Sequence, residues 1–203
     1  MPFFETNISG TAKLLELARR FNLRFHQIGT DEVYGPSAPE DGISESSLLL
    51  PSSPYSSSKA SADLIALSYA KTFGTNVTVS RCTNNIGPWQ HCEKLVPTVI
   101  SNVLLHKQIP IYGSGLQRRH WIDVDDHNKA VIDIVENGTA GEIYNIAPAD
   151  SCWISNLDMV KQICSALDVQ EDLVVHVADR AAHDQSYYLT SKKLDQIRNV
   201  SKS

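Results

Sequence analysis

The sequence predicts an α/β protein whose central strands run parallel, and three observations support this fold class. Helix-like and strand-like segments alternate along most of the 203 residues. A strand candidate at 23–28, a helix-like segment and the β-branched strand candidate 76–81 follow one another. Such an order normally gives a right-handed unit with parallel strands. Hydrophobic residues make up 42% of the chain, which is enough for one or two compact cores.

The first elements of this unit are a helix and a short strand. We expect a helix over residues 5–21, because apolar residues such as Leu15 and Ala18 recur on one helical face. The apolar segment 23–28 that follows is a strand candidate, and it leads into a loop at Gly29. The chain should therefore leave the sheet at this point.

A long polar loop and the crossover helix come next. Residues 35–54 are rich in Ser, Pro and Gly, which is typical of a loop. A helix is expected over 55–73 and should stop at Gly74. The segment 76–81, Asn-Val-Thr-Val-Ser-Arg, then reads as a buried strand.

Beyond Pro88 the pattern is less regular, but helices and strands still alternate. The expected helices are 95–106, 126–137 and 156–167, and the expected strands are 109–112, 121–124, 142–146 and 174–178. Gly113-Ser-Gly115 resembles part of a dinucleotide loop, yet no third glycine follows and no strand–turn–helix surrounds it. We interpret it as a tight connection between two strands.

Composition and charge exclude several function classes. The net charge is −5 and no basic stripe is present, so we expect no nucleic-acid partner. Apolar runs are too short to span a bilayer, and the first residues do not resemble an export signal. The cysteines form no Cys-x-x-Cys pair and have no zinc-type histidine spacing; they are Cys82, Cys92, Cys152 and Cys164. A cytoplasmic protein with reduced cysteines and no metal site is expected.

Thr30-Asp31-Glu32 is the first candidate for chemistry, because it follows a predicted strand. Carboxyl ends of parallel strands face the ligand crevice of an open sheet. Two carboxylates and a hydroxyl in that place can supply an acid, a base and a hydrogen-bond donor. Turn formation is the competing interpretation, since Asp and Thr are common in loops after strands.

Tyr55 and Lys59 form the second candidate, at the start of the crossover helix. A spacing of four places both side chains on one face, one turn apart. Tyrosine ordinarily has a pKa of roughly 10, and a nearby ammonium would lower it toward neutrality. Tyr188 and Lys192 share this spacing but follow no strand-to-helix crossover, so we interpret them as surface residues.

The remaining polar candidates are two asparagines and several arginines. Asn84 and Asn85 follow the second strand and either bind a polar ligand or form a turn before Gly87-Pro88. Arg118-Arg119 and Asp179-Arg180 could pair with a diphosphate, although a lone arginine is more often a solvated surface charge.

In order, these motifs resemble the nucleotide-sugar 4,6-dehydratases of the extended short-chain dehydrogenase/reductase family, in particular those acting on dTDP-glucose. The resemblance rests on Thr30-Asp31-Glu32-Val33-Tyr34-Gly35, Ser53-Pro54-Tyr55 with Lys59, Asn84-Asn85 before Gly87-Pro88, Glu93-Lys94-Leu95-Val96-Pro97, Ile111-Tyr112-Gly113, Tyr144-Asn145-Ile146, Asp179-Arg180 and His183-Asp184. It covers nearly the whole chain. It implies a Rossmann-like parallel sheet, a smaller substrate-binding domain and NAD as cofactor.

The resemblance also implies a role for each candidate. Tyr55 would take the proton of the sugar 4-hydroxyl while NAD takes the hydride from carbon 4. Lys59 would lower the tyrosine pKa and contact the ribose, and Thr30 would hydrogen-bond the same oxygen. Glu32 would remove the carbon 5 proton and Asp31 would protonate the departing 6-hydroxyl. Return of the hydride to carbon 6 would give a 4-keto-6-deoxy sugar.

Binding residues, domains and assembly are further implications of the resemblance. The nucleoside-diphosphate sugar would contact Asn84, Lys94, Leu95, Pro110, Tyr112, Arg119, Asn145, Arg180 and His183, with Asn85, Tyr55 and Lys59 near the cofactor. Residues 1–88 and about 116–147 would belong to the NAD-binding domain, and about 89–115 and 148–203 to the sugar-nucleotide domain. Asn7 would support the tyrosine region, and a homodimer is expected.

Some features depart from the family pattern. Gly29, Ile86, His120 and Ala181-Ala182 replace residues usual at these positions, which bears on nucleotide preference more than on reaction type. The family's Gly-rich NAD turn is not found, so we expect a truncated product or fragment. The alternatives are an inactive sugar-nucleotide-binding fragment or scaffold, and a same-fold UDP-sugar epimerase or dehydratase. Asp31 and Glu32 disfavour an epimerase.

Overall fold

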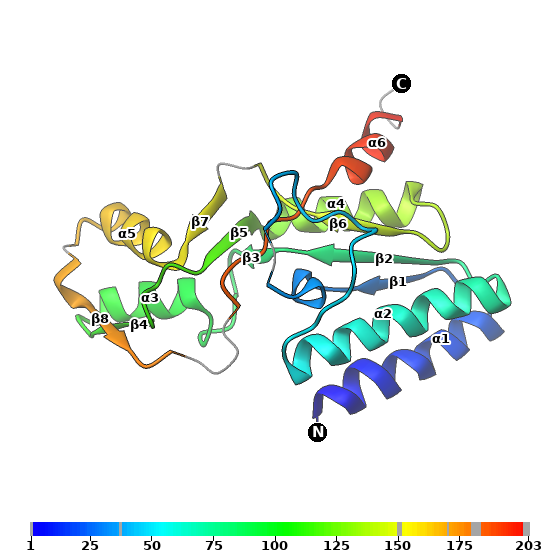
Figure 1. Cartoon of the computed structure of the whole chain (residues 1–203), viewed down its shortest axis with the longest axis horizontal. Coiled ribbons are helices and arrows are strands. Elements are labelled where there is room, and N and C mark those ends of the chain that lie inside the picture. Colours follow the sequence, from blue (N-terminus) through cyan, green and yellow to red (C-terminus); the bar gives the residue numbers. More distant parts are fainter. Residues whose placement is uncertain (1, 37, 150–151, 170, 180–183, 201–203) are drawn as a thin grey trace.

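The computed structural model describes residues 2–36, 38–149, 152–169, 171–179 and 184–200 (Figure 1). Its helical segments are the π-helical turn η1 (Phe4–Gly10), α1 (Thr11–Arg20), the 3₁₀ turn η2 (Asp31–Tyr34), α2 (Pro54–Phe73), α3 (Leu95–Leu104), α4 (Val124–Asn137), α5 (Asn156–Ala166), the 3₁₀ turn η4 (Glu171–Leu173) and α6 (Lys192–Val200). Its strands are β1 (Phe25–Ile28), β2 (Val77–Cys82), β3 (Asn84–Ile86), β4 (Ile109–Tyr112), β5 (Arg118–Asp123), β6 (Ile143–Ile146), β7 (Trp153–Ser155) and β8 (Val174–Val177).

The main sheet has the strand order β1-β2-β6, and both pairings are parallel. Helix α2 connects β1 to β2, which confirms the predicted parallel unit. Ser53 caps α2 through a reciprocal pair of bonds with Ser56, and Pro54 occupies the first turn. Since the strands are parallel, their ends at Ile28, Cys82 and Ile146 lie at one edge of the sheet.

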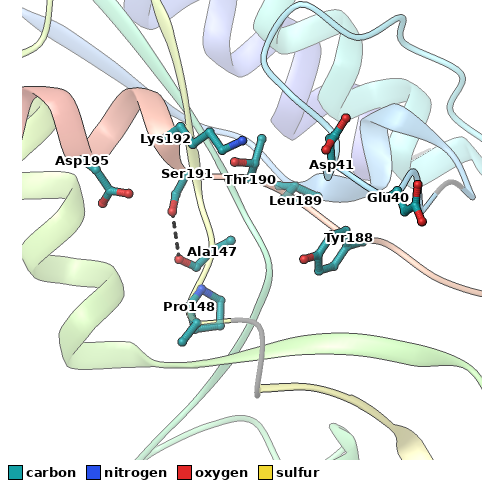
Figure 2. A pocket seen from close by; sticks show the side chains of 11 residues that line it. Glu40, Asp41, Ala147, Pro148, Tyr188, Leu189, Thr190, Ser191, Lys192 and Asp195 are labelled. Atoms are coloured by element: carbon teal, nitrogen blue, oxygen red, sulfur yellow. Dashed lines mark hydrogen bonds between the residues drawn. The ribbon is translucent and has the colours of Figure 1, made fainter.

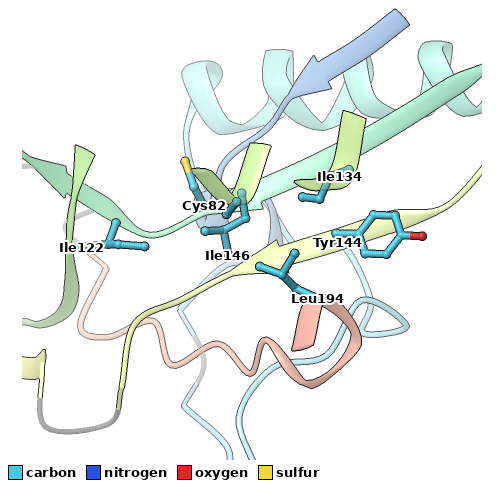
Figure 3. Close-up of a cluster of buried hydrophobic side chains, with 7 residues drawn as sticks. Cys82, Ile122, Ile134, Tyr144, Ile146 and Leu194 are labelled. Atoms are coloured by element: carbon cyan, nitrogen blue, oxygen red, sulfur yellow. The ribbon is translucent and has the colours of Figure 1, made fainter. Parts of the chain in front are cut away.

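Helices cover both faces of this sheet (Figure 1). On one face, Leu15 of α1 and Ala66 of α2 pack on Val77 and Val79 of β2. Side chains alternate along a strand, so the neighbouring β2 residues point to the opposite face. There, α4 and α6 contribute to a second core, shown in Figure 3, which comprises Cys82, Ile122, Ala130, Ile134, Tyr144, Ile146 and Leu194.

A smaller α/β unit is built from β4, β8, α3 and α5. Strands β4 and β8 pair in parallel, which confirms the strands expected at 109–112 and 174–178. The helices pack on them through the buried residues Val99, Val103, Ile109, Ile111, Val160 and Cys164. Gly113 and Gly115 take left-handed conformations with φ of 59° and 73°, and they link β4 to β5, which lie in different sheets.

A third sheet, of order β3-β5-β7, was only partly predicted. Strands β3 and β7 have three residues each, too few for a period-two pattern. Strand β5 begins at Arg118 rather than at 121, because Arg119 and His120 are buried in spite of their polarity. Helix α6 was also not predicted, and the helix expected over 5–21 begins as the π-helical turn η1.

Within the described residues, every helix is too short or too polar to cross a lipid bilayer.

Candidate active site

The Thr30-Asp31-Glu32 motif lies where β1 ends, as predicted, and forms the start of η2. Thr30 is the N-cap of this turn, and its Oγ1 accepts a bond of 3.4 Å from the Glu32 amide. The same hydroxyl donates to Asp31 Oδ1 at 3.1 Å. Turn formation and a chemical role are therefore compatible here, because one hydroxyl serves the turn while fixing the carboxylate.

Asp31 has the most perturbed carboxyl group at this strand end. It is 3% exposed, and within the described residues its Oδ2 has no hydrogen-bond partner. Burial, reinforced by the neighbouring Glu32 charge, raises the pKa of Asp31 to about 7, against the opposing effect of Arg119. Such a group can hold or release a proton near neutral pH.

Tyr55 and Lys59 lie on the first two turns of α2, on the side of the strand ends. Burial and the charges of Glu32 and Asp31 raise the pKa of Tyr55 to about 12. Lys59 Nζ donates to the carbonyl of Ile28, the last residue of β1. In the chain alone the pKa of Tyr55 is therefore raised, chiefly by burial, and the expected lowering of this pKa by Lys59 stays a prediction.

Cys82, the last residue of β2, and Asn85, in β3, adjoin this group. Asn85 Nδ2 donates to Cys82 Sγ at 3.5 Å, and the Cys82 thiol donates to the Gly29 carbonyl at 3.7 Å. Burial raises the pKa of Cys82 to about 11, so it is a neutral thiol. The Asn85 Oδ1 atom is buried and lacks a partner within the described residues. It remains open to a donor from a ligand.

Arg119 and Tyr187 close the site from the other side. The Arg119 guanidinium donates to the Asp184 carbonyl at 2.7 Å and lies 4.7 Å from the centre of the Tyr187 ring. The Arg119 charge also lowers the pKa of Asp31, against the larger effect of burial, so the guanidinium is close enough to act on the first motif. Tyr187 is 4% exposed and was not singled out from the sequence. Its only signal there was a position just after the His183-Asp184 match.

The other residues predicted to contact the substrate differ in their exposure and in the elements that carry them. Tyr112 is 46% exposed on β4, next to the half-buried Pro110. Lys94 is exposed and its Nζ lies 3.7 Å from Glu93 Oε1. Asn84 and Leu95 are half-buried, in β3 and at the start of α3. Arg180 and His183 fall outside the described residues.

Asn145 differs from the prediction of a substrate contact. It is fully buried, and its Nδ2 donates to the Ile43 carbonyl at 2.9 Å while its Oδ1 accepts from Tyr34 at 2.8 Å. Its backbone amide also donates to Glu45 Oε1 at 2.8 Å. These bonds fix the polar loop against β6, so the structure favours an internal role for this side chain.

A buried ion pair beneath the site was missed by the sequence reasoning. Arg81 Nε lies 2.9 Å from Asp63 Oδ2, and the two side chains are 2% and 0% exposed. The Arg81 guanidinium also lies 4.8 Å from the centre of the Tyr34 ring. Asp63 follows Lys59 by four residues, so Tyr55, Lys59 and Asp63 share one helical face. The spacing of four residues between Lys59 and Asp63 was the sequence feature that could have drawn attention to Asp63.

A second contact to α2 comes from the first helical segment. Asn7 Nδ2 donates to Ser58 Oγ at 2.9 Å, one residue before Lys59. The Phe3 ring packs edge-on against the Tyr55 ring, with centroids 5.5 Å apart. Both contacts agree with the expected support of the tyrosine region.

The two cavities next to the main sheet lie away from these groups. The larger has a volume of about 570 Å³ and is bordered by Glu40, Asp41, Tyr188, Lys192 and neighbouring residues (Figure 2). Neither it nor a second cavity of about 410 Å³ includes Asp31, Tyr55 or Lys59 in its walls. In the described part of the chain, no cluster of His, Cys, Asp and Glu could hold a metal ion.

Comparison with known proteins gives one family and a consistent group of relatives. The pattern of the NAD dependent epimerase/dehydratase family matches residues 2–147. A dTDP-glucose 4,6-dehydratase of Streptomyces niveus is 44% identical over 193 residues, which are 95% of this chain and 56% of that protein. The dTDP-glucose 4,6-dehydratase of Mycolicibacterium smegmatis is 42% identical over 195 residues, covering 95% of this chain and 58% of that protein.

Solved structures of dTDP-glucose 4,6-dehydratases are also similar to this chain. A crystal structure of dTDP-glucose 4,6-dehydratase from Bacillus anthracis in complex with NAD superposes with a TM-score of 0.93 at 41% identity, over 98% of this chain and 63% of that one. A dTDP-glucose 4,6-dehydratase from Streptomyces venezuelae with NAD and TYD bound gives 0.91 at 39% identity, over 95% and 59%. The chain thus spans somewhat more than half the length of its relatives.

Proposed function

The chain belongs to the NAD dependent epimerase/dehydratase family, and on that premise we propose that it carries the catalytic residues of a nucleotide-sugar 4,6-dehydratase. The observation that carries this proposal is the adjacent pair Asp31 and Glu32 at the end of β1, close enough for their charges to raise the pKa of Tyr55. Elimination of water needs an acid and a base together, and Asp31 has a pKa of about 7, suited to an acid. The relatives described above from Streptomyces niveus and Mycolicibacterium smegmatis are dTDP-glucose 4,6-dehydratases, so the proposed substrate is dTDP-glucose.

NAD is the proposed cofactor, and the strand-end residues fit it. The Asn85 Oδ1 atom is buried and open to a donor, as a carboxamide group would provide. Lys59 lies at the same edge and can contact a ribose hydroxyl if its ammonium leaves the Ile28 carbonyl. Bound NAD supplies reversible hydride transfer, which removes a hydride from the sugar and later returns it.

Each proton transfer of the reaction is then assigned to a different residue of the chain. Tyr55 accepts the proton of the sugar 4-hydroxyl, and Thr30 hydrogen-bonds the same oxygen once its hydroxyl hydrogen has turned away from Asp31 Oδ1. Because burial raises the pKa of Tyr55 to about 12 in the chain alone, Tyr55 must first lose its own phenol proton to solvent before it can accept one near pH 7, and positive charge near its hydroxyl favours that loss. Lys59, one turn along α2, is placed to provide that charge. Glu32 removes the proton at carbon 5, and Asp31 protonates the departing hydroxyl.

Nucleotide binding falls to Arg119 and to residues of the smaller unit. Arg119 offers a guanidinium suited to a diphosphate, while Lys94 and Tyr112 present exposed groups for the nucleotide. This division supports two domains, with residues 1–88 and about 116–147 for the cofactor. The ranges of about 89–115 and 148–203 then serve the sugar nucleotide.

We further propose a homodimer formed through α1 and α2. These neighbouring helices carry large exposed apolar side chains, namely Leu14, Leu17, Phe21, Leu64 and Phe73. Exposed apolar clusters of this kind mark association surfaces. The four cysteines are free, and for that reason we place the protein in the reducing cytoplasm.

The test is to incubate the 203-residue chain with NAD and dTDP-glucose, and with UDP-glucose in parallel, and to follow loss of water by mass spectrometry. Loss of water that a Tyr55→Phe variant abolishes supports the proposal, whereas Tyr69→Phe on the same helix should leave turnover intact. Binding of dTDP-glucose without turnover, and independent of NAD, would instead favour a non-catalytic sugar-nucleotide-binding protein.

A further inference from the structure

The segment 184–190 packs against η2 and α2, two of the elements that carry the proposed catalytic group. Tyr187 and Leu189 share one buried cluster with Val33, which follows the carboxylate pair, and with Ala60, which follows Lys59. The segment is also tied to the polar loop, since Ile43 bridges in parallel to Leu189. The segment is therefore packed between the polar loop and the elements that carry the proposed catalytic residues.

The Asp184 side chain begins this segment and accepts two hydrogen bonds on one oxygen. Ser52 Oγ donates to Asp184 Oδ2 at 2.6 Å, across 132 residues of sequence. The Tyr187 hydroxyl donates to the same Oδ2 atom. Hydrogen bonds to a carboxylate are stronger than those between neutral groups. Burial and the bond to Asp184 raise the pKa of Tyr187, so it remains a donor at neutral pH.

Each of the two hydrogen-bond donors, Ser52 and Tyr187, lies close to a residue of the proposed mechanism. Ser52 immediately precedes Ser53, the N-cap of α2, and Tyr55 lies in the first turn of that helix. Tyr187 stacks on Arg119, which in turn donates to the Asp184 backbone carbonyl. One carboxylate thus joins the start of the tyrosine helix to the arginine proposed to bind the diphosphate.

We propose that Asp184 is a positioning residue, which holds the first turn of α2 and the Tyr187–Arg119 stack in register through its carboxylate. The effect of Asp184 on catalysis rests on the proposed function. Its hydrogen bonds to Ser52 and Tyr187 do not depend on that function. Removing the carboxylate leaves the Arg119 bond to the Asp184 carbonyl in place. Asp184→Ala should therefore impair the orientation of Tyr55 more than the binding of the nucleotide.

The connection is tested by hydrogen–deuterium exchange on the 203-residue chain, comparing wild type with Asp184→Ala, Ser52→Ala and the double variant. Loss of a charge-assisted bond should speed exchange in the first turn of α2 by roughly fivefold. Because both single variants remove the same bond, the double variant should exchange in that turn no faster than Asp184→Ala. Asp172→Ala, an exposed carboxylate in η4, is the matched control.

Additive effects of the two single changes, or unchanged exchange at the start of α2 in Asp184→Ala, would overturn the proposal. Turnover of dTDP-glucose adds a second measurement, in which Asp184→Ala should lower kcat with KM nearly unchanged. An equal loss through KM alone contradicts a positioning role. A wild-type chain that neither binds nor turns over dTDP-glucose refutes the proposed function, while the exchange result still decides the role of Asp184 in the fold.

Discussion

The strand ends of the main sheet and the smaller β4–β8 unit hold different parts of the proposed site, and they hold them differently. At the strand ends, Asp31 is 3% exposed and Lys59 is already bonded to backbone. In the smaller unit, Tyr112 is 46% exposed, and Lys94 is exposed with its Nζ 3.7 Å from Glu93 Oε1. Groups proposed for proton transfer are thus fixed by the fold, whereas the groups of the smaller unit that are proposed for nucleotide contact are exposed to solvent.

This difference has a consequence for variants. A change at the strand ends alters groups whose proton affinity and orientation depend on burial, so it should affect turnover and stability strongly. A change in the smaller unit removes a contact that forms only with ligand, so it should affect affinity alone.

The largest effect is expected for Asp31→Asn. Loss of a general acid should lower kcat about 10²- to 10⁴-fold, measured as loss of water from dTDP-glucose. The same change should raise the melting temperature at pH 7, because the folded state no longer holds a buried carboxyl with a pKa of about 7.

The sign of this stability effect follows from the raised pKa of Asp31. The unfolded chain has the lower pKa, so charging Asp31 penalises the folded state increasingly as pH rises from about 4 to 7. The gain in Asp31→Asn should therefore vanish at pH 4. A variant equally stabilised at both values, or one with full turnover, contradicts the assignment.

The next largest effect concerns the ion pair below the strand ends. Arg81→Met leaves the Asp63 carboxylate buried without its partner, and it should lower the free energy of unfolding by about 3–5 kcal/mol. The measurement is urea denaturation. The double variant Asp63→Leu/Arg81→Met is the control and should recover most of the loss, because no isolated charge remains.

A pH effect of intermediate size is expected at the same sheet. His26 on β1 bonds Thr78 and Ser80 at 2.9 and 3.0 Å, and burial, with the nearby charges of Arg24 and His127, lowers its pKa to about 4. The folded state therefore binds fewer protons than the unfolded chain between pH 6.5 and 4, and stability falls as pH falls through this range.

His26→Gln isolates this contribution from that of Asp31. Between pH 7 and pH 5 the wild type should lose about 2 kcal/mol of unfolding free energy more than the variant does. Parallel pH dependences of the two proteins would show that His26 titrates normally.

The smallest effect is expected in the β4–β8 unit. Lys94→Ala removes an exposed charge proposed to contact the nucleotide, so KM for dTDP-glucose should rise several-fold while kcat and the melting temperature stay unchanged. A fall in kcat comparable to that of the strand-end variants would remove the distinction between the two regions.

The motifs at the strand ends could be predicted from the sequence because their place in the order of strands and helices was informative in addition to their residue types. Thr30-Asp31-Glu32 follows a strand and Tyr55 begins a crossover helix, and parallel topology brings both to one edge. The sequence was less informative for polar residues whose side chains hydrogen-bond to other parts of the protein. Asn145 resembles a ligand contact in sequence, but its bonds to Tyr34 and Ile43 join segments about a hundred residues apart, which no local pattern reveals.

The pKa of Tyr55 shows a second limit. Helical spacing correctly places Lys59 one turn away, yet spacing reports neither that the ammonium bonds the Ile28 carbonyl nor that burial raises the pKa of Tyr55. Similarly, the pairing of Arg81 with Asp63 depends on how α2 lies across β2. Direction and burial of long side chains are tertiary properties.

The Arg81–Asp63 pair also limits how this sequence can diverge. A lineage that replaces either residue first inherits an isolated charge in its interior, and the change at the second position must arise in that weakened background. Positions 63 and 81 should consequently drift together, while the exposed positions of the β4–β8 unit are free to vary one at a time. Changes in ligand preference are thus more accessible to natural variation than changes in the framework beneath the reacting groups.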